Sequence, residues 1–327
     1  MHVDASGTFP LAEATAPRRA VLSAFVRLDL PARLAGHDLT AAEIATSLDA
    51  HPLALRRFLD LAVTLGLLAC TNARYRCTEA ARRLAEPGAP ARRAAIAAAA
   101  GGAAPWDDEL ARRLRAWRPG QPRPTCPAPG PEESACDLRA AMVAGEALSA
   151  AVDFSARSLL VDLGGGTGGM SIALCRRHPR LRSIVIERAE RVRDAEDEVR
   201  ASGLADRIEV WSGDFTRDPL PGADVALLAN VLSMLSVEDV HGVLESLRRT
   251  LLPGGEVVVS GWMLDDDETG PLPALLVSVQ DIACGEPDVE RSGREVADWV
   301  AAAGFVDVRH GPYLEPLRYV KALQPGS

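Results

Sequence analysis

The chain has 327 residues and a formal net charge of −9. This length allows about two domains, and the acidic balance argues against a general affinity for nucleic acid. No stretch is long and apolar enough to cross a bilayer, and no basic segment followed by an apolar run marks a signal peptide. We therefore expect a cytoplasmic protein whose partner is a small molecule, with no nucleic acid and no membrane among its partners.

The cysteines give no sign of a metal site or of a disulfide framework. None belongs to a C-x-x-C pair or stands next to a histidine, as the ligands of zinc sites commonly do. We expect no metal and a reduced thiol at all six positions, which are Cys70, Cys77, Cys126, Cys136, Cys175 and Cys284.

The N-terminal third has the pattern of a helical module with a helix-turn-helix. A first helix is expected from about Arg18. Thr40 and Glu43 have the spacing of a capping box, in which each side chain satisfies a backbone N–H at a helix start. The helix that they open is expected to run to about Leu48, and a third helix to end before Gly66.

Two short strands, at residues 67–70 and 75–77, follow this third helix and flank a turn, as the strands of a wing do. A winged helix is typical of DNA-binding proteins, but DNA affinity comes mainly from basic side chains that neutralise phosphates. Here the arginines Arg56, Arg57, Arg74 and Arg76 are nearly balanced by Asp29, Asp38, Glu43, Asp49, Asp60 and Glu79. No basic stripe is left over, so DNA binding is the weaker interpretation.

A change of domain is expected after the next two segments. Residues 88–104 are rich in alanine and are expected to form one more helix, and residues 106–117 repeat apolar side chains at helical spacing. Residues 118–133 have proline or glycine at half of their positions, which excludes a regular element. We interpret this last stretch as a linker or as a loop over a site.

The stretch 159–175 reads as a buried strand, a glycine turn and a helix start. Glycines let the backbone of such a turn approach a ligand and aim free N–H groups at it. The turn satisfies the dinucleotide fingerprint G-x-G-x-x-G, which leaves a nicotinamide cofactor open. However, the carboxylate of Asp162 beside the turn would repel a pyrophosphate and attract a cationic ligand. S-adenosylmethionine, which carries an ammonium and a sulfonium, is therefore favoured.

Strands and helices alternate along the rest of the chain. A helix is expected at 134–153, and further strands at 182–186, 208–211, 224–228 and 257–260. This alternation predicts a doubly wound, mostly parallel α/β sheet that binds ligands at the carboxyl ends of its strands. Glu187 follows the second of these strands, where an acidic residue accepts hydrogen bonds from ribose hydroxyls.

The D-x-G-x-G-x-G spacing from Asp162 resembles the first motif of class I S-adenosylmethionine-dependent methyltransferases. Together with the winged helix and the GDF sequence at 213–215, it makes the chain similar to the bacterial winged-helix small-molecule O-methyltransferases of the caffeate and hydroxyindole type. The resemblance implies S-adenosyl-L-methionine as the cofactor and a shell formed by Asp162, Gly164, Gly165, Gly166, Glu187, Arg188, Gly213, Asp214, Phe215 and Asn230. In this shell Asp214 would meet the exocyclic amine of the adenine and Phe215 its ring.

The same resemblance implies the domain organisation. Residues 1–117 would form a winged-helix dimerisation domain, residues 118–133 the linker or loop, and residues 134–327 a Rossmann-like catalytic domain. The family uses its N-terminal module to dimerise and to close over the active site of the partner. A homodimer through the N-terminal domain is therefore expected, together with a substrate pocket to which Met142, Trp262, Met263 and Gln280 contribute.

The chain departs from the family at the catalytic base. Where the family has a histidine that deprotonates the accepting hydroxyl, this chain has Ser233. A serine cannot act as a base unaided near neutral pH. The acidic partners of that histidine would fall near Gly261 and Glu290, and only Glu290 is acidic. Glu290 and Asp281 are therefore the substitute candidates, whereas we expect Ser233 to position a polar group of the substrate.

Three functions remain open at this point. The first is a methyltransferase for a natural-product intermediate whose acceptor needs little help, so that proximity to the methyl group supplies most of the rate. The second is an enzyme that binds S-adenosylmethionine but catalyses a decarboxylation, hydroxylation or cyclisation, as some relatives do. The third is a regulator without catalytic activity. The resemblance and the retained cofactor motifs favour the first.

Overall fold

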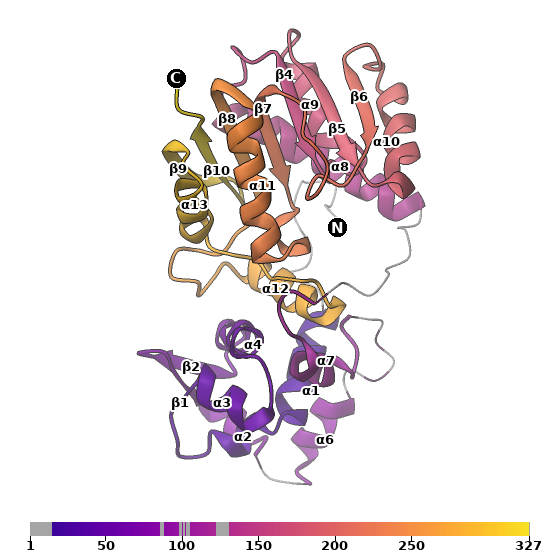
Figure 1. The fold of residues 1–327 in the computed structure, drawn as a ribbon. Helices are drawn as coiled ribbons and strands as arrows, with labels where there is room; N and C mark the ends of the chain where they lie inside the picture. The colour runs from indigo at the N-terminus through magenta and orange to yellow at the C-terminus, as the bar shows by residue number, and fades with distance from the viewer. Residues whose placement is uncertain are drawn as a thin grey trace. The chain divides into compact units, whose positions relative to one another are not determined.

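The computed structural model describes residues 15–85, 88–97, 100, 102, 105–121 and 131–326 (Figure 1). These residues form two compact units. The N-terminal unit comprises residues 15–121 and 267–290, and the C-terminal unit comprises residues 131–266 and 291–326. Within these ranges, none of the helices combines the length and the apolar character that crossing a membrane requires.

The N-terminal unit is a winged-helix module with additional helices. Thr40 caps α3, and its hydroxyl accepts from the Glu43 N–H while the Glu43 carboxylate accepts from the Thr40 N–H at 2.7 Å, so the predicted capping box is confirmed. The turn of the wing has φ angles of 51° and 58° at Asn72 and Ala73, as a tight hairpin turn requires. The elements are α1 (Thr15–Arg27), α2 (Leu30–Arg33), β1 (Leu39–Thr40), α3 (Ala41–Leu48), α4 (Pro52–Thr64), β2 (Leu68–Thr71), β3 (Arg74–Cys77), α5 (Glu79–Arg82), α6 (Pro90–Ala97) and α7 (Leu110–Ala116).

Two predicted helices are shorter than their sequence patterns. The helix predicted at 106–117 begins only at Leu110, because Asp107 forms a turn in front of it: its Oδ1 accepts from the Glu109 N–H at 3.0 Å. Asp107 also pairs with Arg113 at 2.8 Å, which fixes this turn against the helix. The alanine-rich helix predicted at 88–104 is α6, and several of its last predicted residues lie outside the described ones.

The helix α12 (Leu272–Cys284) packs within the N-terminal unit against α4 and α7. The adjoining segment is held there by an ion pair of 2.6 Å between Arg57, which is 1% exposed, and Glu268. The backbone carbonyl of Glu286 accepts a hydrogen bond from the Trp117 indole at 2.8 Å. The predicted boundary at residue 134 assigns this segment to the catalytic domain, whereas residues 267–290 pack with the N-terminal unit.

The C-terminal unit is a doubly wound sheet with strand order β6-β5-β4-β7-β8-β10-β9. Its strands β4 (Leu159–Leu163), β5 (Arg182–Glu187), β6 (Ile208–Ser212), β7 (Ala223–Ala229) and β8 (Leu251–Trp262) pair in parallel, as predicted. The sequence patterns did not predict β9 (Val306–Leu314) and β10 (Leu317–Leu323), which add to the sheet antiparallel. The helices are α8 (Pro131–Ala151), α9 (Gly169–Arg177), α10 (Ala189–Ala201), α11 (Val237–Thr250) and α13 (Gly293–Ala302), with the 3-10 turn η2 (Leu232–Met234).

The two faces of this sheet differ in a way that places the site. Val161 and Leu163 of β4 belong to a hydrophobic core that also takes up side chains of α11 and α13. Since successive residues of a strand point to opposite faces, Asp162 faces the other side, where it contacts Ser171 of α9.

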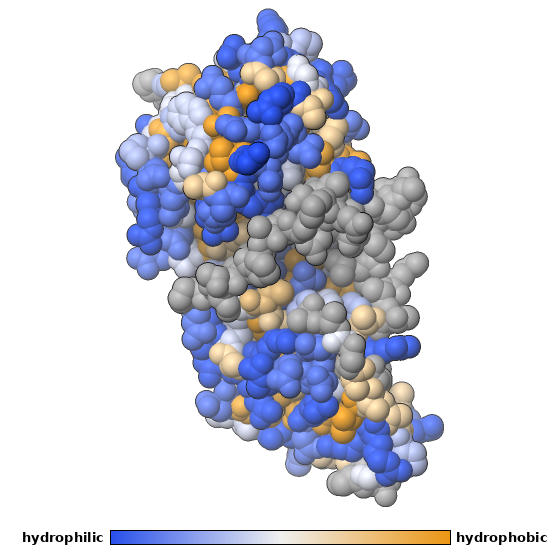
Figure 2. Space-filling view, turned by 90° about the vertical axis from the view of Figure 1, so that its right-hand side faces the viewer, coloured by the Kyte–Doolittle hydropathy of each residue, from blue (hydrophilic) through white to orange (hydrophobic). Residues whose placement is uncertain are grey.

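On the surface in Figure 2, hydrophilic residues predominate and hydrophobic ones form small groups.

Candidate cofactor site

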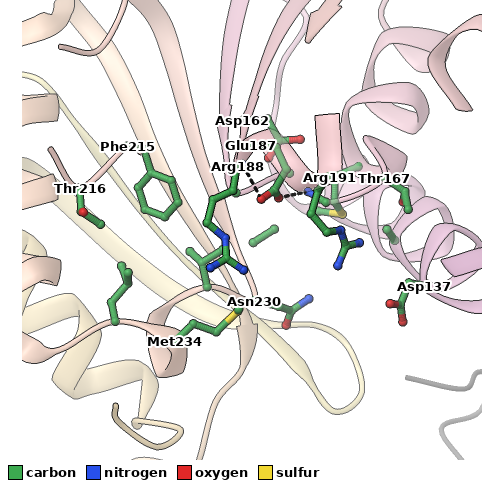
Figure 3. A pocket seen from close by; sticks show the side chains of 18 of the residues that line it. Asp137, Asp162, Thr167, Glu187, Arg188, Arg191, Phe215, Thr216, Asn230 and Met234 are labelled. Atoms are coloured by element: carbon green, nitrogen blue, oxygen red, sulfur yellow. Dashed lines mark hydrogen bonds between the residues drawn. The ribbon is translucent and has the colours of Figure 1, made fainter. Parts of the chain in front are cut away.

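A cavity of about 470 Å³ lies in the C-terminal unit at the carboxyl ends of the parallel strands. Its walls are the glycine turn after β4, the end of β5, the segment after β6, the segment after β7 and one side of α8 (Figure 3). All but one of the predicted cofactor residues line it: Asp162, Gly164, Gly165, Gly166, Glu187, Arg188, Asp214, Phe215 and Asn230. The exception, Gly213, donates its N–H to the carbonyl of Glu187 at 3.0 Å.

The turn requires glycine for steric reasons. A Cβ atom on Gly164 would lie 2.8 Å from Val231 and 3.2 Å from Phe215, and φ at this residue is +68°. A Cβ atom on Gly165 would lie 2.8 Å from the carboxyl group of Asp162. Any larger residue would therefore fill the cavity or displace the groups that line it.

Asp162 is fully buried and only partly satisfied. Its Oδ2 accepts a hydrogen bond of 2.6 Å from the Ser171 hydroxyl, which lies 2.8 Å from the Ser183 hydroxyl. Its Oδ1 is buried without a hydrogen-bond partner. Burial raises the pKa of Asp162 to about 6, although the bond from Ser171 opposes this shift. An unsatisfied buried carboxylate oxygen beside a cavity suits a cationic ligand such as an ammonium group.

Glu187 is held in place at the end of β5 by two backbone donors. Its Oε2 accepts from the Gly166 N–H and its Oε1 from the Arg188 N–H, both at 2.9 Å (Figure 3). The carboxylate thus connects the glycine turn to the start of α10, and these two hydrogen bonds fix its orientation. This position is the one from which an acidic residue holds ribose hydroxyls in nucleotide-binding sheets.

The segment after β6, for which the sequence predicts contacts to the adenine, and the segment after β7 line another part of the cavity. The Oδ1 of Asp214 accepts from the N–H and the hydroxyl of Thr216, which fixes an exposed carboxylate in a turn. Phe215 is half-buried, with its ring against the backbone of Gly164. Asn230 has a φ of 54° and donates its N–H to the Ser260 carbonyl at 2.8 Å. These residues present a carboxylate, an aromatic ring and an amide to the cavity.

The predicted catalytic and substrate residues do not line this cavity. Ser233 is 7% exposed and lies on η2 beside Met234, which does line it. Met142 is half-buried on α8, whereas Trp262 and Met263 are almost completely buried at the end of β8. Asp281, Gln280 and Glu290 belong to the N-terminal unit. The grouping of these residues around an acceptor stays a prediction.

Several lining residues were missed by the sequence analysis. Asp137, Ala140, Ala141 and Ala144 of α8 recur at spacings of three and four, so small side chains on one face of this helix leave room for a ligand. Arg191 lies in the first turn of α10, after Glu187 at the end of β5, and was not singled out. The spacing on α8 is a signal that the sequence does contain, whereas Arg191 is one charge among many on α10.

The sheet, the glycine turn and the acidic cavity define an α/β protein of the S-adenosylmethionine-binding class. Residues 137–306 match the sequence profile of the O-methyltransferase domain, and residues 18–87 match that of the O-methyltransferase dimerisation domain. The chain therefore belongs to the O-methyltransferase family, and S-adenosylmethionine is its cofactor.

Several characterised relatives come from Streptomyces. The chain is 32% identical to the tetracenomycin polyketide synthesis 8-O-methyl transferase of Streptomyces glaucescens, over 89% of this chain and 88% of the relative. It is 30% identical to the 3-hydroxy-5-methyl-1-naphthoate 3-O-methyltransferase of Streptomyces sahachiroi, over 90% and 88%. A shorter match, 43% identical over 36% of this chain and 31% of the relative, is to the aclacinomycin 10-hydroxylase of Streptomyces purpurascens.

Solved structures agree with the fold. An O-methyltransferase family 2 protein from Planctomyces limnophilus, solved in complex with apigenin, superposes with a TM-score of 0.76 at 22% identity and covers 99% of this chain and 100% of its own. Human N-acetylserotonin methyltransferase in complex with S-adenosylmethionine gives a TM-score of 0.59 at 25% identity and covers 95% and 94%. The predicted fold class and family are thus confirmed.

Proposed function

We propose that this chain transfers a methyl group to a phenolic hydroxyl of an aromatic natural-product intermediate. The observation that carries this proposal is the similarity, over about nine tenths of the chain, to two enzymes whose names specify methylation of a polyketide and of a hydroxynaphthoate. Incubation with S-adenosylmethionine and a 3-hydroxynaphthoate should give a methyl ether and one equivalent of demethylated cofactor, both measured by mass spectrometry. A chain that methylates aliphatic amines and no phenol would contradict the choice of acceptor.

The cofactor supplies an electrophilic methyl group when it is bound, and the chain supplies binding and orientation. Asp162, Glu187 and Asp214 present carboxylates to the cavity, and Phe215 presents a ring. A phenol needs little assistance from a base, because its pKa of about 10 lies well below that of an alcohol. Alignment with the methyl group then supplies most of the rate, and Ser233 contributes a hydrogen bond at most.

The Ser233→Ala variant tests this account. Loss of one hydrogen bond worth about 1 kcal/mol should lower kcat/KM roughly fivefold, whereas loss of a true base lowers the rate a hundredfold or more. Ser236→Ala is a matched control, because Ser236 caps α11 from the same connection. A loss of several hundredfold in Ser233→Ala, with cofactor affinity unchanged, would show that proximity alone does not account for catalysis.

The cofactor residues can be tested by ligand-induced stabilisation. Ligand that binds the native state raises the melting temperature in a concentration-dependent manner. Glu187→Ala and Asp214→Ala should each abolish the rise caused by S-adenosylmethionine while leaving the unliganded protein folded. Glu196→Ala should behave as the wild type, since Glu196 is an exposed residue of α10 that does not line the cavity.

A second candidate function is a reaction other than methylation. It is favoured by Ser233 at the place of the family's histidine and by the partial match to a hydroxylase. A hydroxylase would consume oxygen and leave S-adenosylmethionine intact. Oxygen uptake and cofactor turnover, measured in the same reaction, therefore distinguish the two functions. A regulator without activity would give neither signal.

We propose in addition that the chain forms a homodimer through its N-terminal unit. The proposal is supported by the match of residues 18–87 to the dimerisation domain of the family. Exposed apolar surface does not support the proposal. Among the described residues, all large hydrophobic side chains that are strongly exposed belong to the C-terminal unit. Sedimentation velocity at micromolar concentration should give twice the monomer mass, and an active monomer would contradict the proposal. The cytoplasmic location stays a prediction.

A further inference from the structure

Three guanidinium groups line the cofactor cavity, and one of them is not paired. Arg188 lies 3.3 Å from Glu190, and Arg217 lies 3.5 Å from Asp214. Arg191 forms no ion pair with the described residues, and its Nε is buried without a hydrogen-bond partner there. This arginine differs from the other two because no ion pair with the described residues compensates its charge.

The position of Arg191 relates it to the glycine turn. A Cβ atom placed on Gly166 would lie 4.0 Å from a terminal nitrogen of Arg191, so the guanidinium lies over this turn. Figure 3 shows the side chain pointing into the cavity. Glu187, at the end of β5, directs its carboxylate to backbone N–H groups and not to Arg191.

Arg191 is half-buried, and its Nε is shielded from solvent without an acceptor, which is unfavourable in the protein alone because a buried polar group without a partner costs free energy. Such a group is explained when a ligand brings the opposite charge. S-adenosylmethionine has an ammonium, a sulfonium and a single anionic group, the carboxylate of its methionine part. We propose that Arg191 binds this carboxylate and thereby positions the methionine part. Asp162, which has the opposite charge, would then face the ammonium group.

The two groups would then recognise a zwitterion by its separate charges. Asp162 offers a carboxylate oxygen without a donor, and Arg191 offers an Nε without an acceptor, and both line the same cavity. Arg191 also belongs to α10, and Glu187 connects the start of this helix to the glycine turn. The two hydrogen bonds that orient the Glu187 carboxylate therefore also help to place the guanidinium of Arg191.

The experiment compares two ligands that differ in the carboxylate alone. Affinities of wild type and of Arg191→Gln for S-adenosylmethionine and for decarboxylated S-adenosylmethionine are measured by isothermal titration calorimetry. A charge-assisted hydrogen bond corresponds to about a tenfold to hundredfold change in affinity. Arg191→Gln should lose this factor for S-adenosylmethionine and stay within about twofold of wild type for the decarboxylated ligand.

Controls separate this role from a structural one. Arg193→Gln removes an exposed guanidinium of the same helix that does not line the cavity, and it should bind both ligands as wild type does. Arg191→Lys keeps the charge and should recover part of the affinity. Equal losses of both ligands in Arg191→Gln, or no loss of either, would overturn the proposal, and an unchanged melting temperature would show that the variant is folded.

Discussion

The replacement Asp162→Asn should stabilise the protein without ligand and weaken its binding of cofactor. The change keeps the size of the side chain and leaves an amide oxygen to accept from Ser171. Burial raises the pKa of Asp162 from 3.8 to about 6. This difference corresponds to about 3 kcal/mol by which the ionised carboxyl group disfavours the folded state. The variant should recover part of this free energy, and a gain on the order of 5 °C in melting temperature is expected at pH 8.

The sign of the pH dependence follows from the same shift. Between pH 3.8 and about 6, the native state retains a proton on Asp162 that the unfolded chain has lost. The contribution of this group to stability therefore falls as pH rises through this window, and it is constant above it. Asp162→Asn removes the group, so the difference in melting temperature between variant and wild type should be small at pH 4 and reach its full size above pH 6.

Cofactor binding should show the opposite preference. If the ionised Asp162 binds the cationic ligand at pH 8, as proposed, the variant should bind S-adenosylmethionine about tenfold to a hundredfold more weakly. The two affinities should approach each other below pH 6, where the carboxyl group of the wild type is protonated. Thermal unfolding and titration calorimetry at pH 5 and pH 8 measure both effects. A variant that is less stable at pH 8, or that binds cofactor as tightly as wild type, would refute the electrostatic reasoning.

Three further variants test contacts that support the site and the fold. Ser171→Ala removes the donor to Asp162 and should raise the pKa of that carboxyl group further, so that the pH dependence of cofactor binding shifts to higher pH in the same titrations. Arg57→Met breaks a buried ion pair and should lower the free energy of unfolding by about 3 kcal/mol in urea, whereas Arg57→Met combined with Glu268→Gln should lose less. Thr40→Ala removes a capping box and should cost about 1 kcal/mol by the same measurement.

The parts of the fold that sequence predicts well are those in which neighbouring residues determine the structure. The glycine turn needs a strand, a positive φ and a helix start within a few residues, and each has a local signature. The capping box of Thr40 and Glu43 is likewise complete within four residues. Such elements carry their own hydrogen-bond partners, so a pattern of residue types is enough to predict them.

Elements that depend on distant partners were missed, or their packing could not be predicted. The strands β9 and β10 are only partly buried and contain charged residues, so their sequences lack the continuous apolar run of the central strands. The helix α12 is apolar and buried, but its sequence does not say which helices cover it. Arg191, which lines the cavity, was missed for a similar reason, because long-range contacts decide which side chains of α10 face the cavity.

The charges of the cavity bear on the proposal that methyl transfer proceeds without the histidine base of the family. Methyl transfer removes the sulfonium charge and leaves the ammonium and the carboxylate of the cofactor unchanged. On the proposal for Arg191, the residues Asp162 and Arg191 bind groups that are the same before and after the reaction, so these contacts hold the methionine part in place and do not distinguish substrate from product. On the proposed function, the rate then comes from the alignment of the acceptor with the methyl group. An acceptor that is itself acidic, such as a phenol, is the kind of substrate for which this arrangement suffices.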